Sequence, residues 1–132
     1  SAEAEGHAVY LLDAPDAARK KIMRATTDSG REVIFSSAPE KAGVSNLLTI
    51  YQALTHQSKE DIEAGFAGKG YGDLKKEVAE VYRDFATGFQ ARAQRWLDDP
   101  AALDAVLADG AVRARRSASV RLAEVYRRVG FA

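Results

Sequence analysis

The fold is decided by residues 73–97, which read DLKKEVAEVYRDFATGFQARAQRWL. Large apolar residues recur there every three or four positions, which is the spacing of one face of an α-helix. The segment therefore predicts one long helix, the longest of the chain, in which Gly88 is a local weak point. Its buried stripe is expected to consist of Leu74, Val78, Val81, Tyr82, Phe85, Phe89 and Trp96.

Three shorter helices are predicted before this segment. One is expected over residues 15–25, where proline stands in the first turn. A second is expected over residues 44–54, and a third starts at Ser58, which resembles a capping box with Asp61. Residues 33–35 are apolar but too few for a sheet, so we expect a loop that these residues anchor.

Two more helices are predicted after the long one. Asp99 before Pro100 is a helix-start signal, and Gly110 is expected to end or bend that segment. The last helix is expected to run to about Val129, with Gly130 as its C-terminal cap. Because 25 of the 132 residues are alanine, the best helix former, we predict an all-α fold, a helical bundle of about six helices around one core.

Composition excludes several classes of protein. The 19 basic and 19 acidic residues give no net charge, so composition alone does not indicate a nucleic-acid binder. There is no cysteine, which excludes disulfides and thiolate metal sites. The histidines, His7 and His56, stand alone, so neither a metal site nor a Ser-His-Asp set is indicated. Without a signal peptide or an apolar run of about 20 residues, we expect a cytoplasmic protein with no membrane contact.

Charge is nevertheless unevenly distributed. Residues 98–110 contain four aspartates and no basic residue, a net charge of −4. Residues 111–132 contain six arginines against Glu124 alone, a net charge of +5. Two interpretations stay open at this point: a solvated helix face, or a surface for phosphate or RNA on which Arg113, Arg116 and Arg127 project together.

Three glycines in five residues mark the segment 68–72, which reads GKGYG. It lacks the spacing of a nucleotide-binding loop, so a tight turn between helices is favoured over a phosphate cradle. Lys69, Lys75 and Lys76 place positive charge around this turn. Among the aromatic residues, Tyr71 is expected to be the most exposed.

Several strings together resemble one family, the bacterial-type tryptophanyl-tRNA synthetases, in the part that follows their Lys-Met-Ser-Lys-Ser loop. The most specific are GVSNLL and GKGYG, which occur here in the family's order. The resemblance covers nearly the whole chain. The residues that carry it lie in the strings 11–13, 27–29, 43–51, 68–76, 109–111, 122–126 and 129–131.

The resemblance implies that catalysis belongs to a nucleotide-binding domain that precedes this region. Ser1 would be the final serine of the catalytic loop, and residues 1–8 a flexible remnant of the junction. ATP and magnesium would be cofactors of the full-length enzyme, with none in this chain, which alone is expected to be inactive. The family's homodimer contact would lie mostly in the missing domain. In the full-length enzyme the helices near Leu11 and Leu47 would pack on the catalytic domain, so this chain alone should expose apolar surface there.

Residues 9–132 would then be the helical domain that binds the anticodon arm of tRNA(Trp), with no DNA partner. From charge and exposure we expect Arg113, Arg116, Lys75 and Lys76 to hold phosphates. Tyr71 or Arg115 would stack on a base. The alternative is a helical protein-interaction module without RNA binding, which the neutral charge and the acidic stretch 98–110 favour.

Overall fold

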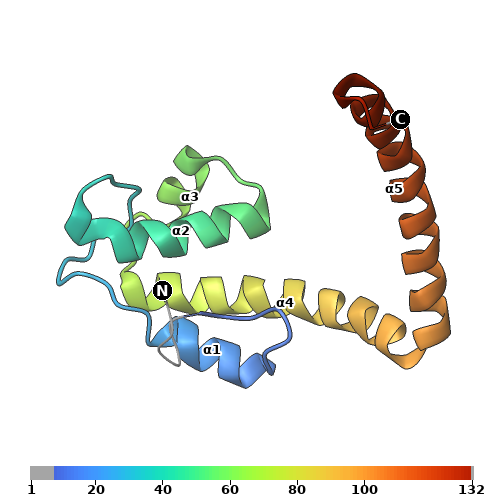
Figure 1. The fold of residues 1–132 in the computed structure, drawn as a ribbon. Coiled ribbons are helices and arrows are strands. Elements are labelled where there is room, and N and C mark those ends of the chain that lie inside the picture. Colours follow the sequence, from blue (N-terminus) through green and yellow to red (C-terminus); the bar gives the residue numbers. More distant parts are fainter. Residues whose placement is uncertain (1–7, 132) are drawn as a thin grey trace. The chain divides into compact units, whose positions relative to one another are not determined.

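A computed structural model describes residues 8–131 of the chain. The predicted all-α fold is confirmed, because the described residues form helices and no strand. Ser1 and residues 2–7 of the predicted junction segment 1–8 lie outside the described residues. No helix in the described range is both long and apolar enough to cross a bilayer. The elements are α1 (Pro15–Met23), the 3-10 helix η1 (Pro39–Lys41), α2 (Ala42–Thr55), α3 (Lys59–Gly65), α4 (Tyr71–Asp98) and α5 (Pro100–Val129) (Figure 1).

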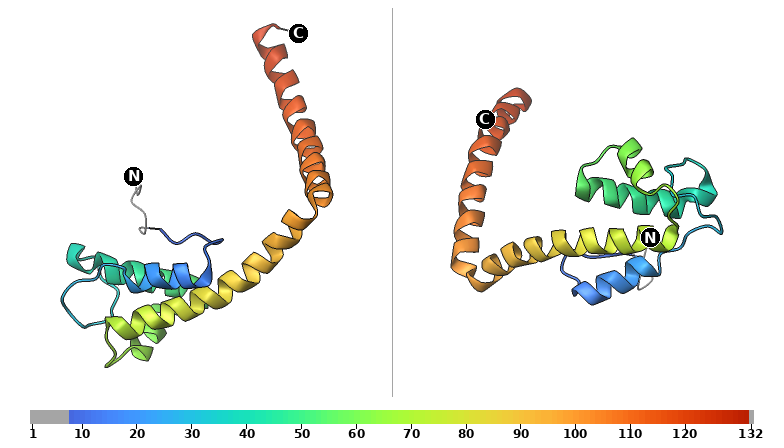
Figure 2. Two further views of the ribbon diagram at one scale, coloured as in Figure 1. Left: turned by 90° about the horizontal axis from the view of Figure 1, so that it is seen from below. Right: turned by 180° about the vertical axis from the view of Figure 1, so that it is seen from behind.

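The chain divides into two compact units between Ala91 and Arg92. The first unit holds α1, α2, α3 and most of α4, and the views in Figures 1 and 2 agree that α1 lies beside the first half of α4. Every buried residue among those described belongs to this unit. The largest fully buried side chains come from three of its helices: Val44, Leu48, Ile62, Leu74 and Val78.

The second unit consists of the last turns of α4 together with the whole of α5. None of the residues of α5 is buried. The prediction that all helices share one core is therefore wrong. The first unit has a core, whereas the large apolar residues of α5, among them Leu107, Leu122 and Val129, are exposed. Periodicity identifies the apolar side of a helix, but it does not show whether anything packs there.

Part of the buried stripe predicted for α4 is confirmed. Leu74, Val78 and Tyr82 are buried, but Phe85 is 43% exposed and Trp96 is 46% exposed. Ala86 is the last buried residue of α4. The stripe continues in the sequence beyond the point at which the helix is covered, and burial of Phe85 and Trp96 is the part of the prediction that fails.

Predicted helix ends are largely confirmed. The Ser58 hydroxyl accepts a hydrogen bond from the Asp61 N–H at 3.1 Å, and the Asp99 carboxylate accepts one from the Ala102 N–H at 3.0 Å. Gly130 ends α5 with φ of 79°, a left-handed conformation that costs glycine little. These contacts satisfy amides and carbonyls that a helix end leaves without partners.

The predicted end of a helix at Gly110 is wrong, because α5 is continuous from Pro100 to Val129. Five α-helices and one 3-10 helix therefore replace the expected six helices. Glycine inside a helix costs only about 1 kcal/mol relative to alanine. The residues around Gly110 include many alanines and arginines, which are strong helix formers, and they outweigh this cost.

Apolar exposure near the start of the chain follows the prediction only in part. Leu11 is 41% exposed and Leu12 is 64% exposed, which agrees with the expected apolar exposure near Leu11. Leu47 is only 2% exposed, so the prediction is wrong there. Leu47 faces the core formed with α4, which supplies its burial within this unit.

The segment between α1 and η1 has no regular structure but is tied to the helices. Val33 is 5% exposed, which confirms the predicted apolar anchor. The Phe35 N–H donates to the Glu63 carboxylate at 2.8 Å, and the Ser36 N–H donates to the Ser45 hydroxyl at 3.0 Å. The loop is thereby fixed to α2 and α3.

A close backbone approach at Gly43 joins this loop to α2. A Cβ atom at Gly43 would lie 2.1 Å from the Thr26 carbonyl oxygen, which is too close for any side chain. We predict that Gly43→Ala lowers the free energy of unfolding by about 1–3 kcal/mol, because backbone must move to admit the methyl group. Urea denaturation measures the loss.

Gly72→Ala is the matched control for this substitution. Gly72 lies in the first turn of α4, with nothing within 4 Å of a built Cβ, so alanine should leave stability unchanged or raise it by up to about 1 kcal/mol. Equal stability of the Gly43→Ala protein and the wild type would contradict the proposed close packing.

Candidate nucleic-acid interface

The arginines predicted to bind phosphate are exposed on α5. Arg113 and Arg116 line one shallow depression on this helix with Ser117, Val120 and Arg121, whereas Arg127 does not line it. Arg113 lies 3.8 Å from the Asp109 carboxylate, and such an exposed pair contributes little stability. Arg113, Arg115 and Arg116 are therefore accessible to a ligand.

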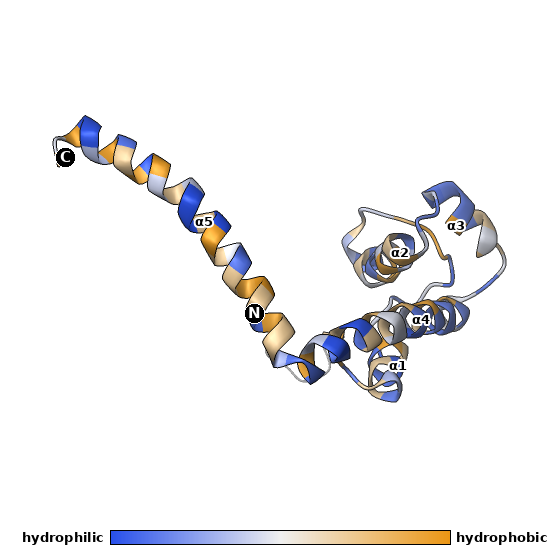
Figure 3. Cartoon of the chain, turned by 90° about the vertical axis from the view of Figure 1, so that its right-hand side faces the viewer, coloured by the Kyte–Doolittle hydropathy of each residue, from blue (hydrophilic) through white to orange (hydrophobic). Residues whose placement is uncertain are grey.

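Acidic partners reach only some of these arginines. Glu124 pairs with both Arg121 and Arg128. Within residues 8–131, neither Arg115 nor Arg116 forms an ion pair. Hydrophobic and hydrophilic residues alternate along α5 (Figure 3), so the arginines share this helix with exposed apolar side chains.

The predicted lysines belong to the first unit, at the start of α4. Lys75 is half-buried, whereas Lys76 is exposed and lies 3.9 Å from the Asp73 carboxylate. The lysines and the arginines therefore form two separate candidate surfaces on two units of the chain. His56 is exposed just after α2, with φ of 58°.

The glycine-rich segment is a turn between α3 and α4, as favoured from its sequence. Gly68 has φ of 77°, and the Gly70 N–H donates to the Asp73 carboxylate at 3.2 Å. A carboxylate thus takes one of the amides that an anion would need. The turn places Tyr71 as the first residue of α4.

The predicted exposure of Tyr71 is wrong, because its ring is 9% exposed and packs in the core. Its hydroxyl donates to the Asp28 carboxylate at 2.8 Å and accepts a hydrogen bond from the Lys41 ammonium at 2.8 Å. A buried and fully engaged ring does not stack on an RNA base. The spacing of Tyr71 from Leu74 and Val78 on one helical face is the signal that indicated burial.

Asp28, Lys41 and Tyr71 form a cluster in which the two charged side chains stabilise each other. Burial alone would raise the pKa of the Asp28 carboxyl, but hydrogen bonds from the Gly30 N–H and the Tyr71 hydroxyl outweigh it, and with the Lys41 charge they lower the pKa. The Tyr71 hydrogen bond raises the pKa of Lys41 against the opposing effect of burial, and Asp28 raises it further. Asp28 and Lys41, 3.6 Å apart, therefore stay charged at neutral pH.

Comparison with known proteins gives a consistent result. Residues 1–87 match the sequence model of the family described as tRNA synthetases class I (W and Y). Tryptophan–tRNA ligase 2 of Streptomyces avermitilis is 49% identical over 123 residues, which are 93% of this chain and 36% of that protein. Tryptophan–tRNA ligase of Leifsonia xyli is 47% identical over 131 residues, 99% of this chain and 39% of that protein.

A solved structure agrees with these relatives. The crystal structure of tryptophanyl-tRNA synthetase from Mycoplasma pneumoniae superposes with a TM-score of 0.65 and 32% identity, over 72% of this chain and 31% of that one. The resemblance seen in the sequence strings is confirmed. The chain spans a little over a third of the length of these curated relatives.

Stability should depend on pH through Asp28. Because the pKa of Asp28 in the folded state lies below its ordinary value of 3.8, its contribution is present above that value and is lost as pH falls through the lower folded pKa. We predict that Asp28→Asn is less stable than the wild type at pH 7, and that the difference shrinks in acid. Urea midpoints across the acid range measure it.

The exposed Asp84 provides the control, because Asp84→Asn should change stability little at any pH. A difference between Asp28→Asn and wild type that stays constant down to the lowest pH would show that the charge of Asp28 is not what stabilises the cluster.

Proposed function

The chain belongs to the class I tRNA synthetases (W and Y), and on this basis we propose that it is the part of a tryptophan–tRNA ligase that binds the anticodon arm of tRNA(Trp). The proposal is supported by one observation above all. The second half of α5 exposes arginines of which Arg115 and Arg116 have no ion-pair partner within residues 8–131.

Phosphate binding is the first role of this surface. Arg113 and Arg116 line the same depression, and a guanidinium matches the two oxygens of a phosphate. Each neutralised phosphate releases condensed counterions, which supplies affinity that weakens as salt rises. Lys75 and Lys76 would add phosphate contacts from the first unit.

Base recognition is the second role. Arg115 is exposed, and a guanidinium plane stacks on an unpaired base. Tyr71 and Arg115 were the two candidates for stacking on a base, and because Tyr71 is buried, Arg115 remains. Exposed apolar side chains lie on the same helix, so a base that stacks on Arg115 would also contact apolar surface.

The chemistry of the ligase would reside in the part of the relatives that this chain does not span. There ATP and magnesium would activate tryptophan, and a homodimer contact would form, in the cytoplasm. The described residues 8–131 contain no group of three His, Cys, Asp or Glu side chains that could hold a metal ion.

A second candidate function is a protein-interaction module. Leu107 is 61% exposed, Leu122 is 49% exposed and Val129 is 56% exposed on α5, which leaves an apolar stripe available for another protein. RNA binding and protein binding by α5 differ in their dependence on salt, since burial of apolar surface is not weakened by it.

RNA binding can be tested by charge reversal. We predict that Arg113→Glu with Arg116→Glu weakens binding of a tRNA(Trp) anticodon-arm transcript at least about tenfold. The slope of log affinity against log salt should fall by about two, one for each lost phosphate contact. Fluorescence anisotropy over a salt series measures both quantities.

The matched control reverses two exposed basic residues of the first unit, Arg31→Glu with Lys59→Glu. This pair changes net charge equally but lies outside the proposed surface. An equal loss in both double variants would reduce the effect to net charge, and unchanged affinity in the α5 variant would exclude this face from RNA binding.

The chain alone is expected to lack the first activity of a tryptophan–tRNA ligase, which is the activation of tryptophan. We expect no tryptophan-dependent exchange of pyrophosphate into ATP by this chain, because the resemblance assigns catalysis to a nucleotide-binding domain that precedes this region. A full-length relative serves as the positive control in the same assay. Exchange above the level of a reaction without tryptophan would overturn the proposal that catalysis resides in the part of the relatives that this chain does not span.

A further inference from the structure

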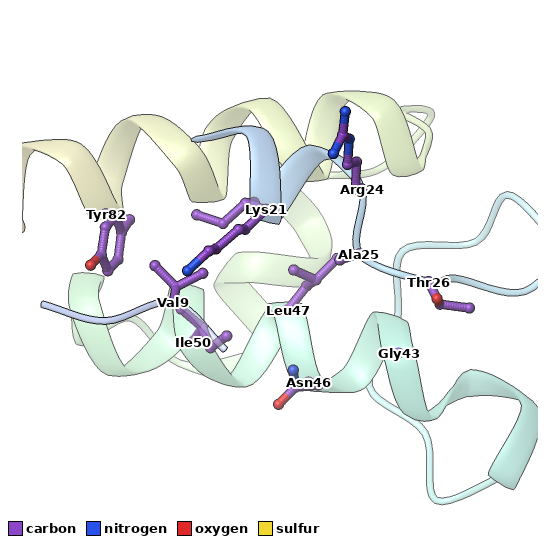
Figure 4. Close-up of a pocket in the computed structure, with 11 residues that line it drawn as sticks. Val9, Lys21, Arg24, Ala25, Thr26, Gly43, Asn46, Leu47, Ile50 and Tyr82 are labelled. Atoms are coloured by element: carbon purple, nitrogen blue, oxygen red, sulfur yellow. The ribbon is translucent and has the colours of Figure 1, made fainter. Parts of the chain in front are cut away.

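A hollow of about 440 Å³ lies between α1, the first half of α2 and α4, in the range of small-ligand sites. All of its lining residues belong to the first unit. They come from four separate stretches of the sequence, which is why no motif indicated the hollow. Figure 4 shows its labelled residues arranged around an apolar centre.

Apolar side chains form the floor. Leu47 and Ile22 are 2% and 4% exposed, and Val9 and Ile50 add partly buried surface. The Tyr82 ring closes one side, and its hydroxyl donates to the Tyr10 carbonyl at 2.8 Å. This bond fixes the ring, so the floor and the side wall are formed before any ligand arrives.

Polar side chains surround this floor. Arg24 and Asn46 stand on opposite rims, and Thr26 lies beside Gly43 on a third side (Figure 4). Within residues 8–131 the side chains of Arg24, Thr26 and Asn46 make no hydrogen bond or ion pair with the protein. A ligand would therefore engage them without breaking an existing contact.

Positive charge predominates next to the hollow. The segment from Pro15 to Arg24 holds four basic residues against Asp16 alone. One of the four, Lys21, is engaged by Asp13 at 2.8 Å. Arg24, which follows α1 directly, lines the hollow and has no ion-pair partner among residues 8–131, so an anionic group is favoured at this rim.

We propose that this hollow binds one nucleotide. Its base would lie against the apolar floor, the Asn46 amide would meet the base edge, and Arg24 would hold the phosphate. A base has apolar faces and a polar edge, and an asparagine amide supplies both a donor and an acceptor to such an edge. An unpaired RNA nucleotide and a free nucleotide share this chemistry, and the RNA source rests on the proposed function.

The test measures binding of a full tRNA(Trp) transcript and of ATP to the 132-residue chain and its variants. Asn46→Ala should weaken nucleotide binding about fivefold, the value of one hydrogen bond. Arg24→Gln should weaken it about tenfold through the lost charge-assisted bond. Both residues are exposed, so thermal unfolding of the variants should match the wild type.

Two further variants make the test specific. Arg19→Gln removes the same charge from an exposed position of α1 that does not line the hollow, and should change affinity less than about twofold. Ala25→Leu fills the hollow without changing charge and should abolish binding. If Ala25→Leu fails to fold, Asn46→Ala and Arg24→Gln still decide the question.

The outcomes separate this inference from the proposed function. If the Arg24→Gln and Asn46→Ala variants bind RNA as tightly as the Arg19→Gln variant, the hollow is not the binding site. RNA binding by the chain, and with it the proposed function, would still stand. ATP binding that these variants weaken, without RNA binding, supports the hollow as a site for a free nucleotide and overturns the proposed function. Binding of neither probe overturns both.

Discussion

The structure of the first unit depends on burial of one face of α4 between Tyr71 and Ala86. Six of the buried residues come from this stretch of a single helix, and the other elements pack on it through Val44, Leu48 and Ile62. Because burial of apolar surface is the dominant favourable term in folding, the elements beside α4 are placed by how well they cover this face. The hollow beside Tyr82 and the cluster around Tyr71 are both consequences of that placement.

Local sequence signals predicted the helices well. Helix ends at Ser58, Asp99 and Gly130 follow from side-chain hydrogen bonds and backbone conformations that involve neighbouring residues only. The exposure of Phe85 was not predictable in this way, since it depends on where other elements stop covering α4. The same limit explains Gly110, where the surrounding helix formers decide the outcome rather than the glycine itself.

The candidate sites show the same division. The charge imbalance of α5 lies within one continuous segment, so the sequence shows it directly, and the structure adds only which arginines have acidic partners. The hollow brings together Val9, Arg24, Asn46 and Tyr82, which are far apart in the chain. No spacing rule relates such residues, because their proximity is a product of tertiary packing.

The irregular loop between α1 and η1 connects the fold to the proposed sites. A loop of this length without helix or strand is uncommon in a compact domain and is often functional. Here the Thr26 carbonyl packs against Gly43, Asp28 binds Tyr71, and Phe35 binds Glu63. These contacts hold the loop at several points, so the rim residue Thr26 is positioned by the fold and not by a ligand. A rim that is already ordered loses little conformational entropy on binding, which is the physical advantage of building a binding site on a tied loop.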